Sequence, residues 1–285
     1  MATWNSANGS YQSGNKTLFE VQGLATPNGM IVSNTNPLPV TGLSANSIAS
    51  APFEWQVALG NIDGATQVNI FGYTATVNAT PAIVWENSPR EYAYINTAQR
   101  LSVNSSSVTD DSCKVLISGL DANWAPLSEV VQLNGTTVVT TNNAFLRVNS
   151  MILTQPGAGQ EMNIGHITAY YNSTKLAIID PNAGRTQMSQ YSVANNYTLF
   201  VQNVNIFSGD AAGASKYMNF RVDVKNNVSN VNFILLHTTW QNGYQLPRVN
   251  PFGYAGKSDV RWQLFTNSGE YTGSVVIEAI LIRNS

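Results

Sequence analysis

Short segments with strand-like alternation recur from about residue 51 to the C-terminus, and clusters of Gly, Asn, Asp and Pro separate them. Side chains of a strand alternate between two faces, whereas an amphipathic helix repeats its apolar residues every three or four positions. No segment of 12 or more residues shows the helical repeat convincingly. Regularly spaced short strands and turns are typical of sandwiches and jelly rolls. The sequence therefore predicts an all-β fold, an antiparallel β-sandwich of jelly-roll type.

The predicted strands are rich in β-branched and aromatic residues. They are residues 54–59, 68–77, 82–85, 114–120, 128–133, 136–140, 145–153, 165–171, 175–179, 197–206, 217–224, 232–240, 260–265 and 273–282. Asn134 and Gly135 separate two of these strands, and Asn-Gly is a strong hairpin signal because both turn residues must take a positive φ. We therefore expect residues 128–133 and 136–140 to pair as a hairpin within an antiparallel meander.

Three regions follow from the distribution of these signals. Residues 1–50 are rich in Asn, Ser, Gly and Pro and contain few apolar clusters, which predicts an extended N-terminal arm that orders against a partner. Residues 51–155 are expected to form a first β domain. Residues 156–285 are expected to form a second domain, a β-sandwich.

The chain carries few charges, and this limits its functions. Charged residues make up 11% of the sequence, against roughly 25% in typical soluble domains, and Asn makes up about one residue in eight. The net charge is -2 and there is no basic run, so nucleic-acid binding is not expected. The sequence contains no apolar run of 18 residues, the length that would predict a membrane-spanning helix. The N-terminus lacks the pattern of a secretory signal, so we expect synthesis in a host cytoplasm.

The residues that usually carry chemistry are sparse. His166 and His237 are the two histidines, and each lies in an apolar strand where a structural role is the more frequent one. Cys113 follows Asp110 and Asp111, whose charges would oppose a reactive thiolate. The two aspartates could bind a cation, but a solvated turn is the more frequent reading. We therefore predict no catalytic, cofactor or metal residues, and a protein that is not an enzyme.

Aromatic residues offer a different kind of site. The chain has six Trp and 12 Tyr, and exposed aromatic rings can stack on sugars as they do in carbohydrate-binding modules. The candidate glycan-stacking residues are Trp124, Trp240, Tyr244 and Trp262. The alternative, to which we give more weight, is that these rings fill sandwich cores and subunit interfaces.

Two parts of the chain resemble a known group of proteins. The C-terminal part comprises residues 198–204, 220–222, 251–252, 257–262 and 280–284, and the middle part comprises residues 116–124 and 131–141. Together they resemble uncharacterised virion structural proteins of marine tailed phages, including cyanophages. The resemblance covers roughly residues 100–285 and consists of strand-and-turn patterns. It implies a particle component and supplies no catalytic residues.

The functional expectation is a virion structural protein that acts by assembly, most simply as a capsid decoration or cement protein. Its expected partners are further copies of itself and other virion proteins, either the major capsid protein or tail components. A tail, baseplate or fibre component is the nearest alternative. A carbohydrate-binding or receptor-binding module is the alternative from another class.

Overall fold

The computed structural model describes residues 52–87, 90–209, 217–240, 244–267, 269 and 271–284, together with three short strands nearer the N-terminus. The chain divides into two compact units, residues 1–51 and 52–285. The first unit contains a three-stranded antiparallel sheet, in the order β1-β2-β3. Its strands are β1 (Thr3–Asn5), β2 (Ser10–Ser13) and β3 (Lys16–Phe19). The rest of the predicted arm lies outside the described residues.

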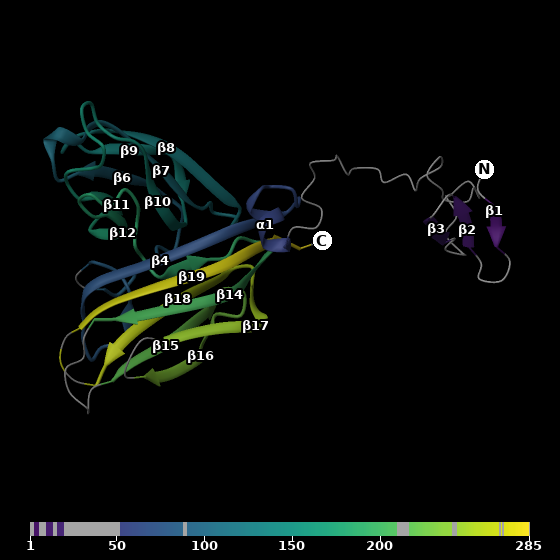
Figure 1. Ribbon diagram of the computed structural model, residues 1–285. Helices are drawn as coiled ribbons and strands as arrows, with labels where there is room; N and C mark the ends of the chain where they lie inside the picture. Colours follow the sequence, from purple (N-terminus) through teal and green to yellow (C-terminus); the bar gives the residue numbers. More distant parts are fainter. Residues whose placement is uncertain are drawn as a thin grey trace. The chain divides into compact units, whose positions relative to one another are not determined.

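The second unit is built from two β-sandwiches, which Figure 1 shows as a teal group of strands and a blue, green and yellow group. The strand pairings described in this unit are all antiparallel. The prediction of an all-β antiparallel sandwich is therefore confirmed.

The first of these, the central sandwich, contains a sheet in the order β10-β7-β8 and a sheet in the order β12-β11-β6-β9. Its elements are β6 (Gln99–Ser105), η1 (Val108–Asp110), β7 (Asp111–Leu120), β8 (Pro126–Asn134), β9 (Val139–Phe145), β10 (Arg147–Gln155), β11 (Ile167–Tyr171) and β12 (Thr174–Ile179). Leu101, Val115, Met151 and Ile167 are buried between the sheets. Burial of each such side chain contributes about 1.5–3 kcal/mol.

The second, the C-terminal sandwich, contains a sheet in the order β13-β18-β15-β16, with β5 paired to β18, and a sheet in the order β17-β14-β19-β4. Its elements are β4 (Ala65–Val77), β5 (Ala82–Ile83), β13 (Gln190–Ser192), β14 (Tyr197–Ser208), β15 (Met218–Asn226), β16 (Val231–Trp240), β17 (Tyr244–Ala255), β18 (Ser258–Thr266) and β19 (Tyr271–Arg283). Phe220, Trp262 and Ile277 are buried in its core.

The two sandwiches do not follow each other simply along the chain. Strand β4 precedes the whole central sandwich, yet it pairs with β19 from Ala65 opposite Ile282 to Val77 opposite Tyr271. Strands β11 and β12 follow residue 156, yet they belong to the central sandwich. The sheets therefore draw strands from both sides of the predicted boundary at residues 155–156.

The predicted strand at residues 54–59 is wrong, because this segment forms the helix α1 (Phe53–Ala58). The carbonyl of Pro52 accepts hydrogen bonds from the backbone N–H groups of Trp55 and Gln56, and Pro52 lies at the N-cap. Six residues are too few for periodicity to separate a helical turn from a strand. Proline is compatible with a helix start, because the N–H that it lacks would have no intrahelical acceptor there.

The predicted pairing of residues 128–133 with 136–140 is also wrong. The tight turn is present, since the N–H of Thr137 donates to the carbonyl of Asn134 at 2.9 Å and Gly135 has a φ of 54°. However, β8 pairs with β7 in one sheet, and β9 pairs with β6 in the other. The Asn-Gly turn therefore carries the chain from one sheet of the central sandwich to the other.

Asparagine supports the turns between strands. Asn172, Asn182, Asn196 and Asn230 all have a positive φ between 52° and 61°. Asn tolerates this left-handed conformation better than most side chains do. Part of the high Asn content is therefore explained by the turns that a chain of many short strands requires.

Candidate functional site

A buried ion pair joins the two sandwiches. Arg147, the first residue of β10, places Nε 2.9 Å from Oδ1 of Asp259 and Nη2 3.0 Å from Oδ2, and Asp259 belongs to β18. Both side chains are buried. The Asp259 carboxylate also accepts from Ser192 at 2.5 Å and from Asn227 at 2.8 Å. Because the charges are paired and their hydrogen bonds are made, this contact fixes one sandwich against the other.

Two aromatic rings complete this contact, which we call the inter-sandwich clamp. The guanidinium carbon of Arg147 lies 4.7 Å from the ring centre of Tyr94 and 4.8 Å from that of Trp124. A cation over an aromatic face is attracted to the ring, and desolvation strengthens the attraction. Burial raises the pKa of the Tyr94 hydroxyl well above its ordinary value, so the ring stays uncharged beside Asp259.

The clamp covers one end of a polar ladder on the outer face of the β15–β18 pair. In the register of these strands, Lys225 lies opposite Asp259, Asp223 opposite Arg261, and Arg221 opposite Gln263. Side chains two positions apart share a face of a strand, so these residues point to the same side. The Asp259 end is buried under Arg147, whereas Arg221, Asp223 and Arg261 are each partly exposed.

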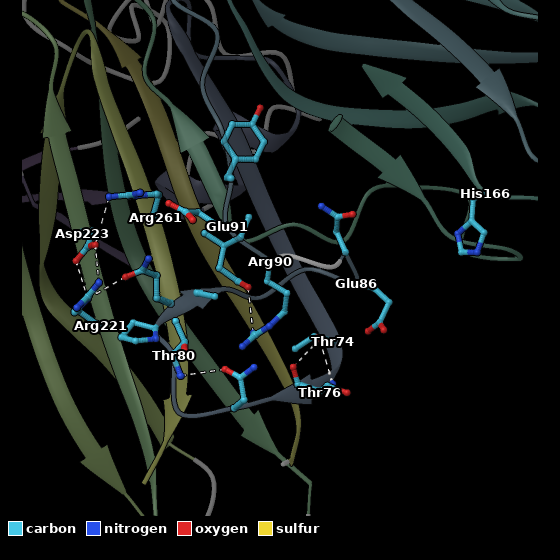
Figure 2. A pocket seen from close by; sticks show the side chains of 17 residues that line it. Thr74, Thr76, Thr80, Glu86, Arg90, Glu91, His166, Arg221, Asp223 and Arg261 are labelled. Atoms are coloured by element: carbon cyan, nitrogen blue, oxygen red, sulfur yellow. Dashed lines mark hydrogen bonds and ion pairs between the residues drawn. The ribbon is translucent and has the colours of Figure 1, made fainter. Parts of the chain in front are cut away.

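The open end of the ladder forms one wall of a cleft with a volume of about 830 Å³. The end of β4 and the segment that follows it form most of the remainder, and this segment contributes Glu86, Arg90 and Glu91. Figure 2 shows Arg221, Asp223 and Arg261 on one side of the cleft, Glu86 on the other, and Arg90 and Glu91 between them. Also lining it are Thr74, Thr76, Asn78, Thr80, Pro81, Ala82, Ile83, Asn87, Tyr92, His166 and Gln263.

The charged groups on the ladder wall are held in place by one another. Asp223 accepts from Nη2 of Arg221 at 3.0 Å and from Nη2 of Arg261 at 3.4 Å. Nε of Arg221 donates to Oε1 of Gln263 at 2.9 Å. In the segment after β4, Arg90 donates to the carbonyl of Ile83 at 3.3 Å. Burial lowers the pKa of the Arg90 guanidinium, and the neighbouring Glu86 opposes that shift. The wall therefore presents fixed guanidinium donors beside a carboxylate.

The residues that the sequence singled out for chemistry lie elsewhere or are already paired. Asp110 is buried and accepts from the hydroxyl of Ser105 and from the N–H groups of Ile164 and Gly165, so N–H and O–H donors occupy its oxygens. Cys113 is buried, and burial raises the pKa of its thiol. Among the described residues, no group of three or more His, Cys, Asp or Glu could hold a metal ion.

His166 lies at the rim of the cleft. Its Nδ1 is 3.1 Å from Oδ1 of Asp180. Burial raises the pKa of the Asp180 carboxyl, and the neighbouring His166 opposes that shift. The backbone of His237 lies in β16, opposite Arg221, and its side chain lies outside the described residues.

The four candidate glycan-stacking residues do not form one surface. Trp262 is buried in the core of the C-terminal sandwich, so a sugar cannot reach its ring. Trp124 is partly buried, and Arg147 occupies one face of its ring. The side chains of Trp240 and Tyr244 lie outside the described residues, and their backbones belong to β16 and β17.

Strand β16 carries an exposed apolar surface at the end of its sheet. It pairs with β15 on one side and ends the β13-β18-β15-β16 order. Val231, Phe233 and Ile234 on this strand are exposed, as is Val228 in the preceding turn. A second exposed apolar group, on and just after α1, consists of Phe53, Trp55 and Leu59. Within the described residues, no helix is long and apolar enough to cross a membrane.

No family model and no curated protein matches the chain. Solved structures overlap with it weakly, at 9% sequence identity: the infectious bursal disease virus Gt strain, with a TM-score of 0.21, and the VP2 subviral particle of that virus, with a TM-score of 0.20. They cover 81% and 79% of this chain and 78% of each matched chain. Overlap at these TM-scores is too small to assign a shared fold or function.

Sequence reasoning missed the cleft and the clamp. Their residues come from strands that are far apart in sequence, such as Arg147 with Asp259 and Asp223 with Arg261. The available signal was a set of charged residues at alternate positions, namely Arg221 with Asp223 and Asp259 with Arg261. That pattern places each pair on one strand face, but it does not show which strands are neighbours.

Proposed function

We propose that this chain is a structural protein of a virus particle, that it performs no catalysis, and that it joins a neighbouring copy of itself through the free edge of β16. The observation that carries this proposal is β16 itself, an apolar strand with no proline and no charged residue, which pairs with β15 alone among the described strands. An edge strand offers unpaired N–H and C=O groups to any second strand that approaches. Subunits that assemble can use such an edge to extend a sheet across their interface.

The edge strands β16 and β17, one from each sheet of the C-terminal sandwich, differ in sequence. Strand β17, at the end of the other sheet, contains Pro247, Arg248 and Pro251. Proline and charged side chains are the devices that soluble proteins use to block edge pairing. Strand β16 spans Val231–Trp240 and contains no proline and no Lys, Arg, Asp or Glu. This difference supports a paired role for β16 and a solvent-facing role for β17.

Low charge supports the same proposal. The chain has 14 Lys and Arg and 16 Asp and Glu in 285 residues. Burial of an unpaired charge at an interface costs several kcal/mol, whereas apolar and amide surface avoids that cost. Surfaces built from Asn, Ser and Thr can form hydrogen bonds across a contact without matched charges. A chain of this composition suits repeated subunit contacts.

The finer role that we propose is capsid decoration or cement, with the major capsid protein as the partner. The resemblance of residues 100–285 to virion proteins of marine tailed phages supports a place on such a particle. A tail, baseplate or fibre position is the alternative. A decoration protein should be present in hundreds of copies per particle, and a tail component in small multiples of three or six. Band intensities from purified particles, with electron microscopy to locate the protein, distinguish the two.

A matched pair of variants tests the β16 contact. Val231 on β16 and Val138 in a loop of the central sandwich are exposed to 51% and 49%. We expect Val231→Lys to lower self-association of the full chain at least tenfold in analytical ultracentrifugation, because a charge would be buried at the edge. Val138→Lys should leave it unchanged. A wild-type chain that stays monomeric at high concentration, or a Val231→Lys variant that associates normally, would contradict the proposal.

A further inference from the structure

We propose that the cleft between β15–β18 and the segment after β4 binds an uncharged glycan through adjacent hydroxyl groups. This inference is independent of the β16 contact, since the cleft is lined by the outer face of β15 and β18, by residues within 74–87 and 90–92, and by His166. It also moves the expected sugar contact from aromatic rings to a set of fixed polar groups.

The first argument is hydrogen-bonding capacity. A guanidinium has five N–H donors. The hydrogen bonds of Arg221 use Nε and Nη2, and those of Arg261 use Nη2, so donors remain on both groups. Opposite them, Glu86 uses Oε2 to accept from the N–H of Ala75, which leaves Oε1, and Glu91 is exposed. A sugar hydroxyl both donates and accepts, so it complements donors and acceptors that face the same space.

The second argument is charge balance. Arg90, Arg221 and Arg261 are matched in number by Glu86, Glu91 and Asp223 in the lining. A phosphate or a sulfated sugar would meet three carboxylates, and a cation would meet three guanidinium groups. Neither would find the single-sign surface that favours charged ligands. A ligand with many hydroxyls and no net charge avoids both repulsions.

The third argument is shape and rigidity. The volume of about 830 Å³ falls within the range of roughly 300–1,000 Å³ that is typical of small-ligand sites. Among its lining residues are threonines, amides and charged groups, which can exchange hydrogen bonds with the hydroxyls of a ligand. Asp223 holds both Arg221 and Arg261, so these donors are ordered before a ligand arrives. Preorganisation of this kind lowers the cost of binding.

The experiment uses the full chain on a glycan array that carries both neutral and acidic glycans. The best neutral oligosaccharide is then titrated calorimetrically. We expect Arg261→Ala and Glu91→Ala to weaken its Kd at least tenfold each. Arg283→Ala is the matched control, because Arg283 pairs with exposed Asp63 outside the cleft, and its Kd should stay within twofold. Circular dichroism spectra establish that each variant is folded.

Salt dependence separates an uncharged ligand from an anion. Between 50 and 300 mM NaCl, we expect the Kd for the neutral glycan to change less than twofold, since no ligand charge is screened. Inorganic phosphate should not compete. The proposal is overturned if no neutral glycan binds, if only acidic glycans bind with strong salt dependence, or if binding survives in both cleft variants. Adding Val231→Lys should leave the Kd unchanged, so failure of the β16 proposal would be recognised separately.

Discussion

Arg147 and Asp259 form a two-pronged ion pair, 2.9 and 3.0 Å long, between strands that belong to different sandwiches. Two carbonyls, of Ile95 and Leu146, accept from Nη1 of the same guanidinium. The pair lies at the covered end of the polar ladder whose open end lines the cleft. The clamp therefore sets the position of the central sandwich relative to the wall of the candidate glycan site.

Removal of one partner of this pair should destabilise the protein strongly. We expect Arg147→Met to lower the free energy of unfolding by about 3–5 kcal/mol, because Asp259 would remain buried without its counter-charge. Arg147→Lys should recover little, since a single ammonium nitrogen lacks the planar fork that meets the two carboxylate oxygens in parallel. Chemical denaturation with two spectroscopic probes measures the change.

An exposed ion pair provides the control for this variant. Arg283 and Asp63 lie 2.8 Å apart, with 52% and 94% of their side chains exposed. Loss of such a pair typically costs less than about 1 kcal/mol. Equal losses for Arg147→Met and Arg283→Ala would contradict the assignment of the clamp.

The all-β fold follows from local patterns, and the sequence predicted it well. Alternation in residues 197–206 and 273–282 corresponds to β14 and β19, and the predicted strands 165–171 and 175–179 correspond to β11 and β12, joined at Asn172. These features depend on neighbours in sequence. Local chemistry is sufficient for them, because a strand face and a turn are each decided within a few residues.

The features that the sequence did not predict share a different cause: each depends on strands that are distant in sequence. Strand β17 was not among the predicted strands. Its Pro247 and Pro251 disfavour a strand on local grounds, yet both are tolerated at a sheet edge. The Asn134–Gly135 turn was identified, but the exchange of sheets after it depends on how β8 and β9 pack. Likewise, the pairing of Asp223 with Arg261 exists only once the strand register is known.

The thiol of Cys113 should react only when the protein opens. Burial raises its pKa, and the neighbouring Asp110 adds to that shift, so the reactive thiolate is scarce at neutral pH. We expect labelling by a thiol-specific disulfide reagent to follow the unfolding transition in denaturant. A Val138→Cys variant supplies an exposed thiol as the control, which should react at once. Rapid labelling of Cys113 in the native protein would contradict its buried position.

Asp180 should make stability depend on pH in a defined direction. Burial raises the pKa of its carboxyl above the ordinary value of 3.8. The folded state then holds the proton more tightly than the unfolded state does. The protonated Asp180 therefore contributes to the free energy of unfolding below about pH 3.8, and this contribution is lost as the pH rises through the pKa of Asp180 in the folded state. Asp180→Asn, which cannot ionise, should gain stability relative to the wild type between pH 3 and pH 7.

A second variant tests the cause of that pH dependence. His166 lies 3.1 Å from Asp180 and opposes the rise of its pKa. We expect His166→Gln to raise the pKa of Asp180 further, which carboxyl-selective NMR titration measures. A lower pKa in this variant would show that His166 does not stabilise the ionised carboxylate.

Gly119 on β7 should tolerate no side chain, because of its contact with the clamp strand. A Cβ at this position would overlap the backbone carbonyl oxygen of Arg147 on β10. The paired strands would have to separate, at a cost of about 1–3 kcal/mol or more for overpacking. The shift would also displace Arg147 from Asp259, so Gly119→Ala and Arg147→Met should act through a shared contact. A double-mutant cycle measures this, with a coupling of about 0.5–3 kcal/mol expected and strict additivity contradicting it.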